Sequence, residues 1–376
     1  MRPRNNNPSA WRTQSCVPCR DSSRHHLAHG KPSVGTSADA ARTSACATPE
    51  WQSYFPTTRR SLIACAVLLS LAAVAVWAQQ TGPAVFRADT RLVVCHTTVV
   101  DKNGHLVTTL TQDAFTVYEN GVVQPIRIFK REDVPVSMGL IIDNSGSMRD
   151  KRAKVEAAAL ALVKDSNPDD EVFIVNFNDE AFLDNPHGKA FTNDIKEMEE
   201  ALTRIDSRGG TAMRDAIRMS IDHLKEKAHK DKKVLVVVTD GNDNASVVSL
   251  ENLVKASQQS EVLLYGVGLL GEEERREAQR AQRALKALGT ATGGEVYFPK
   301  DAGEVEKIAH QVARDIRNQY TIQYTPSDTA MDGTFRQIKI TVKAPGNPTV
   351  RTRSGYYATP DQAGPTGPGA KGPTSK

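Results

Sequence analysis

Cysteine is scarce in this chain, and its placement excludes a fold held together by internal disulfides. The 376 residues include five cysteines, and all but one lie in or before an uncharged apolar segment at residues 62–78. If that segment is removed during export, Cys95 is the one thiol left and has no partner for an internal bridge. Cys95 lies in a strand-like run and is expected to be a small core residue. The fold must therefore be stabilised by packing.

The chain also lacks a basic excess in the part that is expected to fold. The formal net charge is +4, but residues 1–60 carry nine Lys and Arg against three Asp and Glu. This segment contributes +6, which leaves −2 for the remainder. A nearly neutral folded part does not have the basic surface of a nucleic-acid-binding protein, so no nucleic-acid partner is expected.

Only one long hydrophobic run occurs, at residues 62–78, and it predicts export. Arg59 and Arg60 precede the run and small residues close it at Ala78, which is the pattern of a secretory signal peptide over residues 59–78. The run is slightly long for a signal and slightly short for a transmembrane helix, so membrane attachment by an uncleaved anchor is the alternative. Either way, we expect the folded part in the periplasm, the cell envelope or the extracellular space.

The two ends of the chain have compositions that predict no regular structure. Residues 1–58 are rich in Arg, Ser, Asn and Pro without periodicity, and they are interpreted as disordered or as a misassigned start. Residues 359–376 are rich in Pro, Gly and Lys and are predicted to be a disordered tail.

Two separate segments have the texture of short β-strands. In residues 84–133, the pairs Asn103-Gly104 and Asn120-Gly121 lie between β-prone flanks, which is a strong hairpin signal. Residues 319–358 return to the same alternating pattern. The two segments are predicted either to form one sandwich around an inserted domain or to be two independent β units.

Residues 134–318, between these segments, alternate strand-like and helix-like runs. Strands are predicted at residues 136–142, 172–177, 234–238, 262–267 and 295–298. Helices are predicted at residues 151–164, 195–205, 211–225, 250–257, 272–288 and 302–318, with Gly289 expected to end the fifth of them. This alternation predicts an α/β fold with a central, mostly parallel sheet that helices cover on both faces.

Oxygen-bearing side chains follow two of the predicted strands and open one helix. Asp143, Ser145 and Ser147 stand at alternate positions after an apolar strand, and Asp240 follows another strand. Thr211 lies in the loop before a helix. Because ligands in such sheets bind beyond the carboxyl ends of the strands, these five side chains are expected at one edge. Two carboxylates and three hydroxyls suit a hard divalent cation, which can keep a coordination position for a partner's Asp or Glu.

Three other kinds of site could be considered at this loop, but the chain lacks a residue that each of them requires. An EF-hand needs a bidentate Glu at position twelve of the loop, where this chain has Lys154. A haloacid-dehalogenase-like phosphatase needs a second carboxylate two residues after Asp143, where Ser145 stands. A serine hydrolase of the nucleophile-elbow type needs Gly-x-Ser-x-Gly, but the local sequence is Asp-Asn-Ser-Gly-Ser.

The five residues together resemble the metal-ion-dependent adhesion site of von Willebrand factor type A (VWFA) domains. Asp143-x-Ser145-x-Ser147, then Thr211, then Asp240 in Thr-Asp-Gly match the family in type and order. The resemblance implies a Rossmann-like α/β domain that binds Mg²⁺ or Mn²⁺ through these residues and contacts another protein. It implies no enzymatic activity.

The flanking segments extend the resemblance to residues 84–358. Phe-x-Val-Tyr-Glu-Asn-Gly at residues 115–121 and Arg-Ser-Gly-Tyr-Tyr at residues 353–357 are similar to stretches of an exported bacterial VWFA-related family of the acidobacterial type. The fold class expected from the resemblance is a VWFA domain at residues 134–318 flanked by a β-sandwich-like region from the segments before and after it. The resemblance identifies no partner.

Four polar residues near the predicted site are candidates for partner binding: Asn144, Asp179, Asp243 and Asn244. Asp179 follows another strand end, and Asp243 and Asn244 directly follow Thr-Asp-Gly. Residues of this kind after strands are also common turn formers. These residues are therefore predicted either to contact a partner or to form turns.

The function predicted from the sequence is a non-enzymatic, metal-dependent adhesion or scaffolding module exported from a bacterial cytoplasm. Its partner is an unidentified protein that presents Asp or Glu. One alternative is an accessory subunit of an ATPase- or chelatase-type complex. The other is a structural envelope component whose metal only stabilises the fold.

Overall fold

The computed structural model describes residues 92–203, 207–270 and 275–360. The predicted segments 1–58 and 59–78, and the tail from residue 361 onward, lie outside the described residues. None of the described helices is both long enough and apolar enough to cross a bilayer. The described chain contains one six-stranded sheet and two four-stranded sheets.

The six-stranded sheet is central to an α/β domain and is mostly parallel. Its strand order is β10-β9-β8-β5-β6-β7, and β7 alone runs antiparallel to its neighbour. The strands are β5 (Val136–Asp143), β6 (Glu171–Phe177), β7 (Ala181–Leu183), β8 (Lys232–Thr239), β9 (Leu263–Gly268) and β10 (Val296–Tyr297). Every residue of β5 is buried, as expected for an apolar strand covered on both faces.

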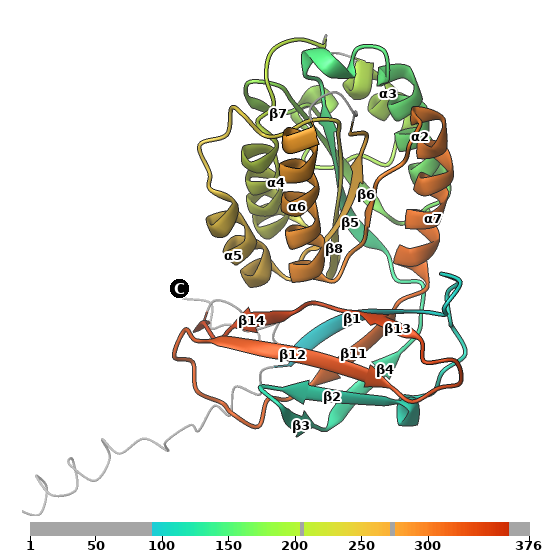
Figure 1. Cartoon of the computed structure of the whole chain (residues 1–376), viewed down its shortest axis with the longest axis vertical. Coiled ribbons are helices and arrows are strands. Elements are labelled where there is room, and N and C mark those ends of the chain that lie inside the picture. Colours follow the sequence, from blue (N-terminus) through green and yellow to red (C-terminus); the bar gives the residue numbers. More distant parts are fainter. Residues whose placement is uncertain (1–91, 204–206, 271–274, 361–376) are drawn as a thin grey trace, which may run out of the picture. The chain divides into compact units, whose positions relative to one another are not determined.

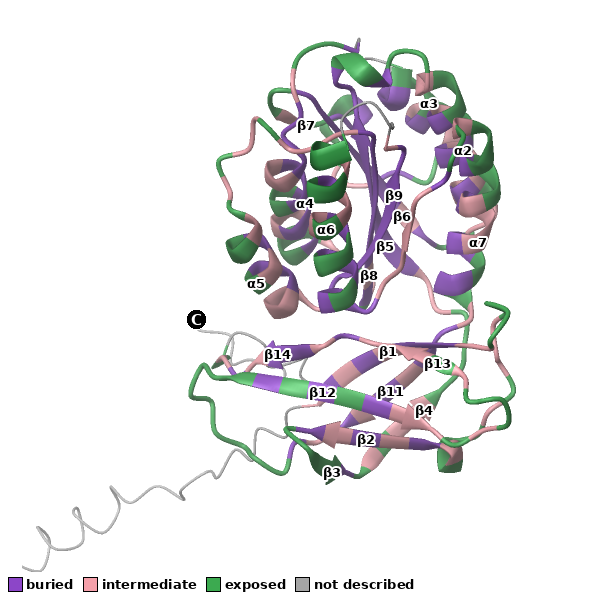
Figure 2. Ribbon diagram, in the orientation of Figure 1, coloured by how far each residue is buried: buried purple, intermediate pink, exposed green. Residues whose placement is uncertain are grey.

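Helices cover both faces of this sheet, and each face has its own apolar core (Figure 1). One face packs against α2 (Arg152–Lys164), α3 (Ile195–Thr203) and α7 (Val305–Arg317). The other packs against α4 (Met213–Lys227), α5 (Leu250–Ser260) and α6 (Arg275–Thr292). Figure 2 shows the sheet buried and the outer surfaces of the helices exposed. The predicted α/β class is confirmed.

The β-rich region combines strands from both ends of the described chain. The sheet β13-β1-β11-β4 contains β1 (Val93–Val100), β4 (Ile126–Lys130), β11 (Tyr320–Tyr324) and β13 (Thr349–Arg351). The sheet β14-β12-β2-β3 contains β2 (Phe115–Glu119), β3 (Val122–Gln124), β12 (Phe335–Val342) and β14 (Gly355–Tyr357). Both sheets share one apolar core, which includes the free thiol of Cys95. The prediction of one sandwich around the α/β domain is confirmed over its rival.

The two predicted hairpins differ in outcome. Asn120 and Gly121 have positive φ angles and join β2 to β3, as the Asn-Gly signal predicts. The turn at Gly104 also forms, but Leu106 makes an isolated bridge to Val100 in place of a second strand. The Tyr320 hydroxyl bonds the backbone at Val107 and Leu110, which fixes the chain after the turn to the sandwich instead.

The expected role of Gly289 as a helix end is wrong. Gly289 lies inside α6, which continues to Thr292 and ends before Gly293, whose φ is +88°. A Cβ at Gly289 would lie 2.8 Å from a methyl carbon of Val296. The missing side chain therefore allows helix and strand to approach closely, and Gly293 supplies the left-handed residue that ends the helix.

Four short 3-10 helices complete the described elements: η1 (Gln112–Ala114), η2 (Gly146–Met148), η3 (Pro186–Gly188) and η4 (Ala302–Glu304). Of these, η2 follows β5 after two intervening residues and carries part of the Ser-Gly-Ser loop. The buried side chain of Met148 anchors this turn in the core beneath α2 and α7.

Replacing Gly139 with alanine should destabilise the central sheet. A Cβ there would lie 2.4 Å from Phe173 Cζ and 2.6 Å from Leu235 Cδ2. The rings of Phe191 and His223 pack against Phe173, so it has little room to move. We expect Gly139→Ala to lower the free energy of unfolding by about 1–3 kcal/mol, measured by denaturant titration.

Gly303→Ala is the matched control for this overpacking test. A Cβ at Gly303 would meet its nearest atom at 3.4 Å, so we expect a change within about 0.5 kcal/mol. Equal stability of Gly139→Ala and the unsubstituted protein would contradict the close packing of β5 against β6 and β8.

Candidate metal-binding site

The two carboxylates of the predicted site are brought together by the pairing of β5 with β8. These strands are parallel neighbours, with Ile142 opposite Val238. Asp143 is the last residue of β5, and Asp240 directly follows Thr239 at the end of β8. The strand order changes direction between β5 and β8, and ligands in open α/β sheets bind at such a point.

Asp143 is buried, and its two oxygens are held by two donors. Its Oδ1 accepts a hydrogen bond of 2.8 Å from the backbone N–H of Ser145, and its Oδ2 accepts one of 2.5 Å from Thr239 Oγ1. The pKa of Asp143 is raised to about 6, chiefly by burial and to a smaller extent by the nearby Asp240 carboxylate, while the hydrogen bonds from Thr239 and Ser145 act to lower it. The carboxylate is thus fixed in orientation in a place where negative charge is costly.

A chain of oxygen atoms links the serine loop to Asp240. Ser145 Oγ lies 3.2 Å from Ser147 Oγ, and Ser147 Oγ donates a bond of 2.7 Å to Asp240 Oδ1. Ser145 and Asp240 are buried, whereas Gly146 and Ser147 are exposed. The cluster therefore opens to solvent on the side of Ser147.

The loop that carries Thr211 closes against both of these segments. The backbone N–H of Gly146 donates to the carbonyl of Gly209 at 3.3 Å. A Cβ built on Gly241 would lie 3.6 Å from Thr211 Oγ1, so this hydroxyl is next to the residue after Asp240. The structure thus brings all five predicted side chains to one edge of the sheet.

The four residues proposed for partner binding all make contacts within the chain. Asn144 is buried and its Nδ2 donates to Asn176 Oδ1 at 2.8 Å, while its Oδ1 is buried without a partner. Asp179 accepts a bond of 2.7 Å from the Gly210 N–H. These contacts fix the loops on either side of the serine turn.

Asp243 and Asn244 fix the start of α4 and the Thr211 loop. Asp243 accepts bonds from the backbone and the guanidinium of Arg214, at 2.7 and 2.9 Å. Asn244 Oδ1 accepts a bond of 2.9 Å from the Thr211 N–H. Contact of any of the four residues with a partner stays a prediction.

Two side chains that contact the candidate ligands are not among the residues predicted from the sequence. Thr239 bonds Asp143, and Lys151 Nζ donates to Asp240 Oδ2 at 2.5 Å. Thr239 had a usable signal, because parallel pairing places the end of β8 beside the end of β5. Lys151 had no such signal, because it lies 89 residues before Asp240 in the chain.

The donor set fits a hard divalent cation. No group of three or more His, Cys, Asp or Glu suited to a metal occurs in the described part of the chain. The cluster at the ends of β5 and β8 instead combines two carboxylates with three hydroxyls, and it contains no imidazole or thiolate. Oxygen-only sets of this kind are typical of Mg²⁺, Mn²⁺ and Ca²⁺ sites.

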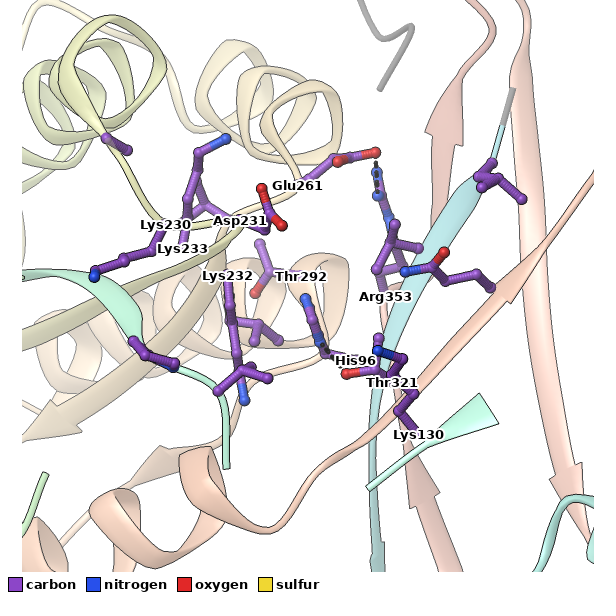
Figure 3. A pocket seen from close by; sticks show the side chains of 18 of the residues that line it. His96, Lys130, Lys230, Asp231, Lys232, Lys233, Glu261, Thr292, Thr321 and Arg353 are labelled. Carbon is purple, nitrogen blue, oxygen red and sulfur yellow. Dashed lines mark hydrogen bonds and ion pairs between the residues drawn. The ribbon is translucent and has the colours of Figure 1, made fainter. Parts of the chain in front are cut away.

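A cavity of about 760 Å³ lies at the opposite ends of the same strands (Figure 3). Lys232, the first residue of β8, lines it and donates to the carbonyl of Ile316. Arg353 lines it and pairs with Glu261 at 3.4 Å. Burial and these two cations lower the pKa of His96 to about 3, so its ring is neutral. The cavity has no part in the oxygen cluster.

The doubly covered parallel sheet, with its oxygen cluster where the strand order reverses, defines a Rossmann-like α/β domain. Within that class, residues 138–311 match the model of the von Willebrand factor type A domain. The α/β domain of this chain is therefore a VWFA domain, and the resemblance to this family is confirmed.

Similar proteins include two from animals that match only part of the chain. Inter-alpha-trypsin inhibitor heavy chain H4 from Bos taurus is 28% identical over 131 residues, which cover 32% of this chain and 14% of that protein. Integrin alpha-11 from Mus musculus is 34% identical over 88 residues, which cover 22% of this chain and 7% of that protein. The chain thus spans a small fraction of the length of these curated relatives.

Among solved structures, von Willebrand factor type A from Catenulispora acidiphila is similar at 15% identity and a TM-score of 0.43. The match covers 70% of this chain and 73% of that one.

Replacing Thr239 with valine should destabilise the domain by removing a donor to Asp143. The substitution keeps the shape of the side chain but leaves Asp143 Oδ2 buried without its bond from Thr239. We expect a loss of about 1–3 kcal/mol in the free energy of unfolding, measured by denaturant titration in the presence of a chelator.

Thr203→Val serves as the control, because the Thr203 hydroxyl is exposed and bonds only to backbone carbonyls of its own helix. An equal loss in the free energy of unfolding for both variants would show that the bond from Thr239 to Asp143 stabilises the domain no more than an exposed hydroxyl within a helix does.

Proposed function

We propose that this protein is a non-enzymatic, divalent-metal-dependent module that captures an acidic residue of another protein. The observation that carries the proposal is the meeting of five oxygen-bearing side chains from three loops, open to solvent at Ser147. VWFA domains typically mediate metal-dependent protein–protein interactions, and the similarity to an integrin and to an inter-alpha-trypsin inhibitor heavy chain supports the same use.

The residues proposed to hold the cation divide into charged and neutral groups. Asp143 and Asp240 supply two negative charges, which balance a divalent ion. Ser145, Ser147 and Thr211 supply neutral oxygens, which leave the ion attractive to a further anion. Mg²⁺ or Mn²⁺ bound here would supply a Lewis-acidic position for the carboxylate of a partner.

The protein residues define where that carboxylate arrives. Buried donors to Asp143 fix one wall of the site, and Ser147 is the exposed member of the set. A partner therefore approaches over the serine turn. The pattern of residues 59–78 supports export to the periplasm, envelope or extracellular space as part of the proposal.

Replacing Asp240 with alanine should abolish cation binding and leave the sheet folded. The substitution removes one of two charged ligands, while the side chain lies at the end of β8 and outside the apolar cores. We expect the heat of Mg²⁺ or Mn²⁺ binding, measured by calorimetry, to be lost with the circular dichroism spectrum unchanged.

Asp222→Ala is the matched control, since it removes an exposed carboxylate on α4 that pairs with Arg218. This variant should bind the cation like the unsubstituted protein. Absence of any heat with the unsubstituted protein would sink the proposal. Unfolding on addition of chelator would favour the purely structural role of the metal.

The captured group should be a carboxylate presented by the partner. In an array of immobilised peptides, we expect binding in Mg²⁺ to peptides with an exposed Glu or Asp, and loss of binding when the acid is replaced by its amide. Chelator should remove the signal, and Asp240→Ala should show none. Binding that persists in chelator or with the amides would contradict capture through the cation.

A further inference from the structure

Lys151 places a positive charge directly on a candidate metal ligand. Its ammonium donates to Asp240 Oδ2 at 2.5 Å, while Ser147 occupies Oδ1 of the same carboxylate at 2.7 Å. The Asp240 side chain is 1% exposed and that of Lys151 is 31% exposed. The pair is therefore partly removed from water, where charge interactions are screened less than on an open surface.

The backbone fixes Lys151 in this place. Its N–H bonds the carbonyl of Met148, which is buried in the core, and it directly precedes the first turn of α2. Its ammonium also lies 3.5 Å from the carbonyl of Leu269. The lysine is thus held between the serine turn and the loop after β9.

The neighbouring cations on the same helix have other partners. Arg152 bonds Glu156 and the carbonyl of Leu202, and Lys154 pairs with Asp301. Of the Lys and Arg side chains in the described ranges, Lys151 alone has a hydrogen bond or ion pair with one of the five candidate ligands. Its charge is therefore a specific property of the site.

We infer that Lys151 makes the binding of the cation and the binding of the partner's carboxylate depend on each other. The inference rests on the proposed function and extends it. Lys151 and a divalent cation share Asp240, and their mutual repulsion weakens binding of the cation alone. The partner's carboxylate relieves that repulsion, so the two ligands bind as a pair.

Charge accounting gives the reason for this coupling. Asp143 and Asp240 carry −2, and Lys151 reduces the charge of the set to −1. A divalent cation brings the set to +1, and one carboxylate restores neutrality. Without the lysine, the cation alone would neutralise the two aspartates, and an added carboxylate would gain less. Such coupling is reciprocal, because each ligand strengthens the other by the same factor.

The test compares Lys151→Met with the unsubstituted protein by calorimetry. Mg²⁺ is titrated alone and then in excess sodium acetate, with sodium chloride matching the ionic strength. Lys151→Met should bind Mg²⁺ alone more tightly, on the order of tenfold, the size of a typical coupling between two bound groups. Acetate should tighten Mg²⁺ binding by the unsubstituted protein and have a smaller effect on the variant.

Two further variants separate charge from position. Lys151→Gln keeps a donor near Asp240 without the charge and should behave like Lys151→Met. Lys154→Met removes a lysine from the same helix that does not touch Asp240, and it should bind Mg²⁺ like the unsubstituted protein. Circular dichroism establishes that each variant is folded.

Three outcomes would overturn the inference. Weaker or unchanged Mg²⁺ binding by Lys151→Met and Lys151→Gln would show that the lysine only positions Asp240 or does nothing. An equal gain in Mg²⁺ affinity in Lys154→Met would show that the effect comes from the net charge of the protein and not from the contact of Lys151 with Asp240. Failure of all variants and the unsubstituted protein to bind Mg²⁺ or Mn²⁺ would remove the proposed function itself, whereas the first two outcomes leave it standing.

Discussion

The parallel pairing of β5 with β8 is the constraint on which the site depends. Their register places the end of one strand beside the end of the other, so Asp143, Thr239 and Asp240 meet without any long loop. The chain then leaves β5 toward α2 on one face and leaves β8 toward α5 on the other. Because the connections diverge, the space above the pair stays available to the serine turn and the Thr211 loop.

The site combines two buried acids, and the two are stabilised differently. Asp143 relies on donors within the sheet edge, and its raised pKa reflects the cost of burial that these bonds do not remove. Asp240 shares its oxygens between the Ser147 hydroxyl and the Lys151 ammonium. The Asp143 carboxylate is therefore held in one orientation by the sheet edge. The negative charge of Asp240 is already partly neutralised by the Lys151 ammonium.

The order of elements and the five candidate ligands could be predicted because both follow local rules. The apolar strands that lead to Asp143 and Asp240 predict one edge of a sheet. Apolar residues at helical spacing predict the helices that cover its two faces. Gly289 could not be interpreted correctly, since a glycine needed for close helix–strand packing is indistinguishable in sequence from one that ends a helix. The contact of Lys151 with Asp240 and the bond of Tyr320 to the loop after Gly104 join residues far apart in the chain, and local pattern carries no information on them.

The α/β domain is inserted into the β-sandwich, and strand pairing within the sandwich fixes the two points where the chain enters and leaves that domain. The strand before the domain, β4, pairs directly with the strand after it, β11, so the entry and exit of the chain are fixed side by side. Arg351 of β13 then bonds Glu295 and the buried Asp315 of α7, and Gln319 bonds both Thr98 and Tyr265. Since α7 packs on α2, which begins beside Lys151, the sandwich supports the helix layer that borders the site.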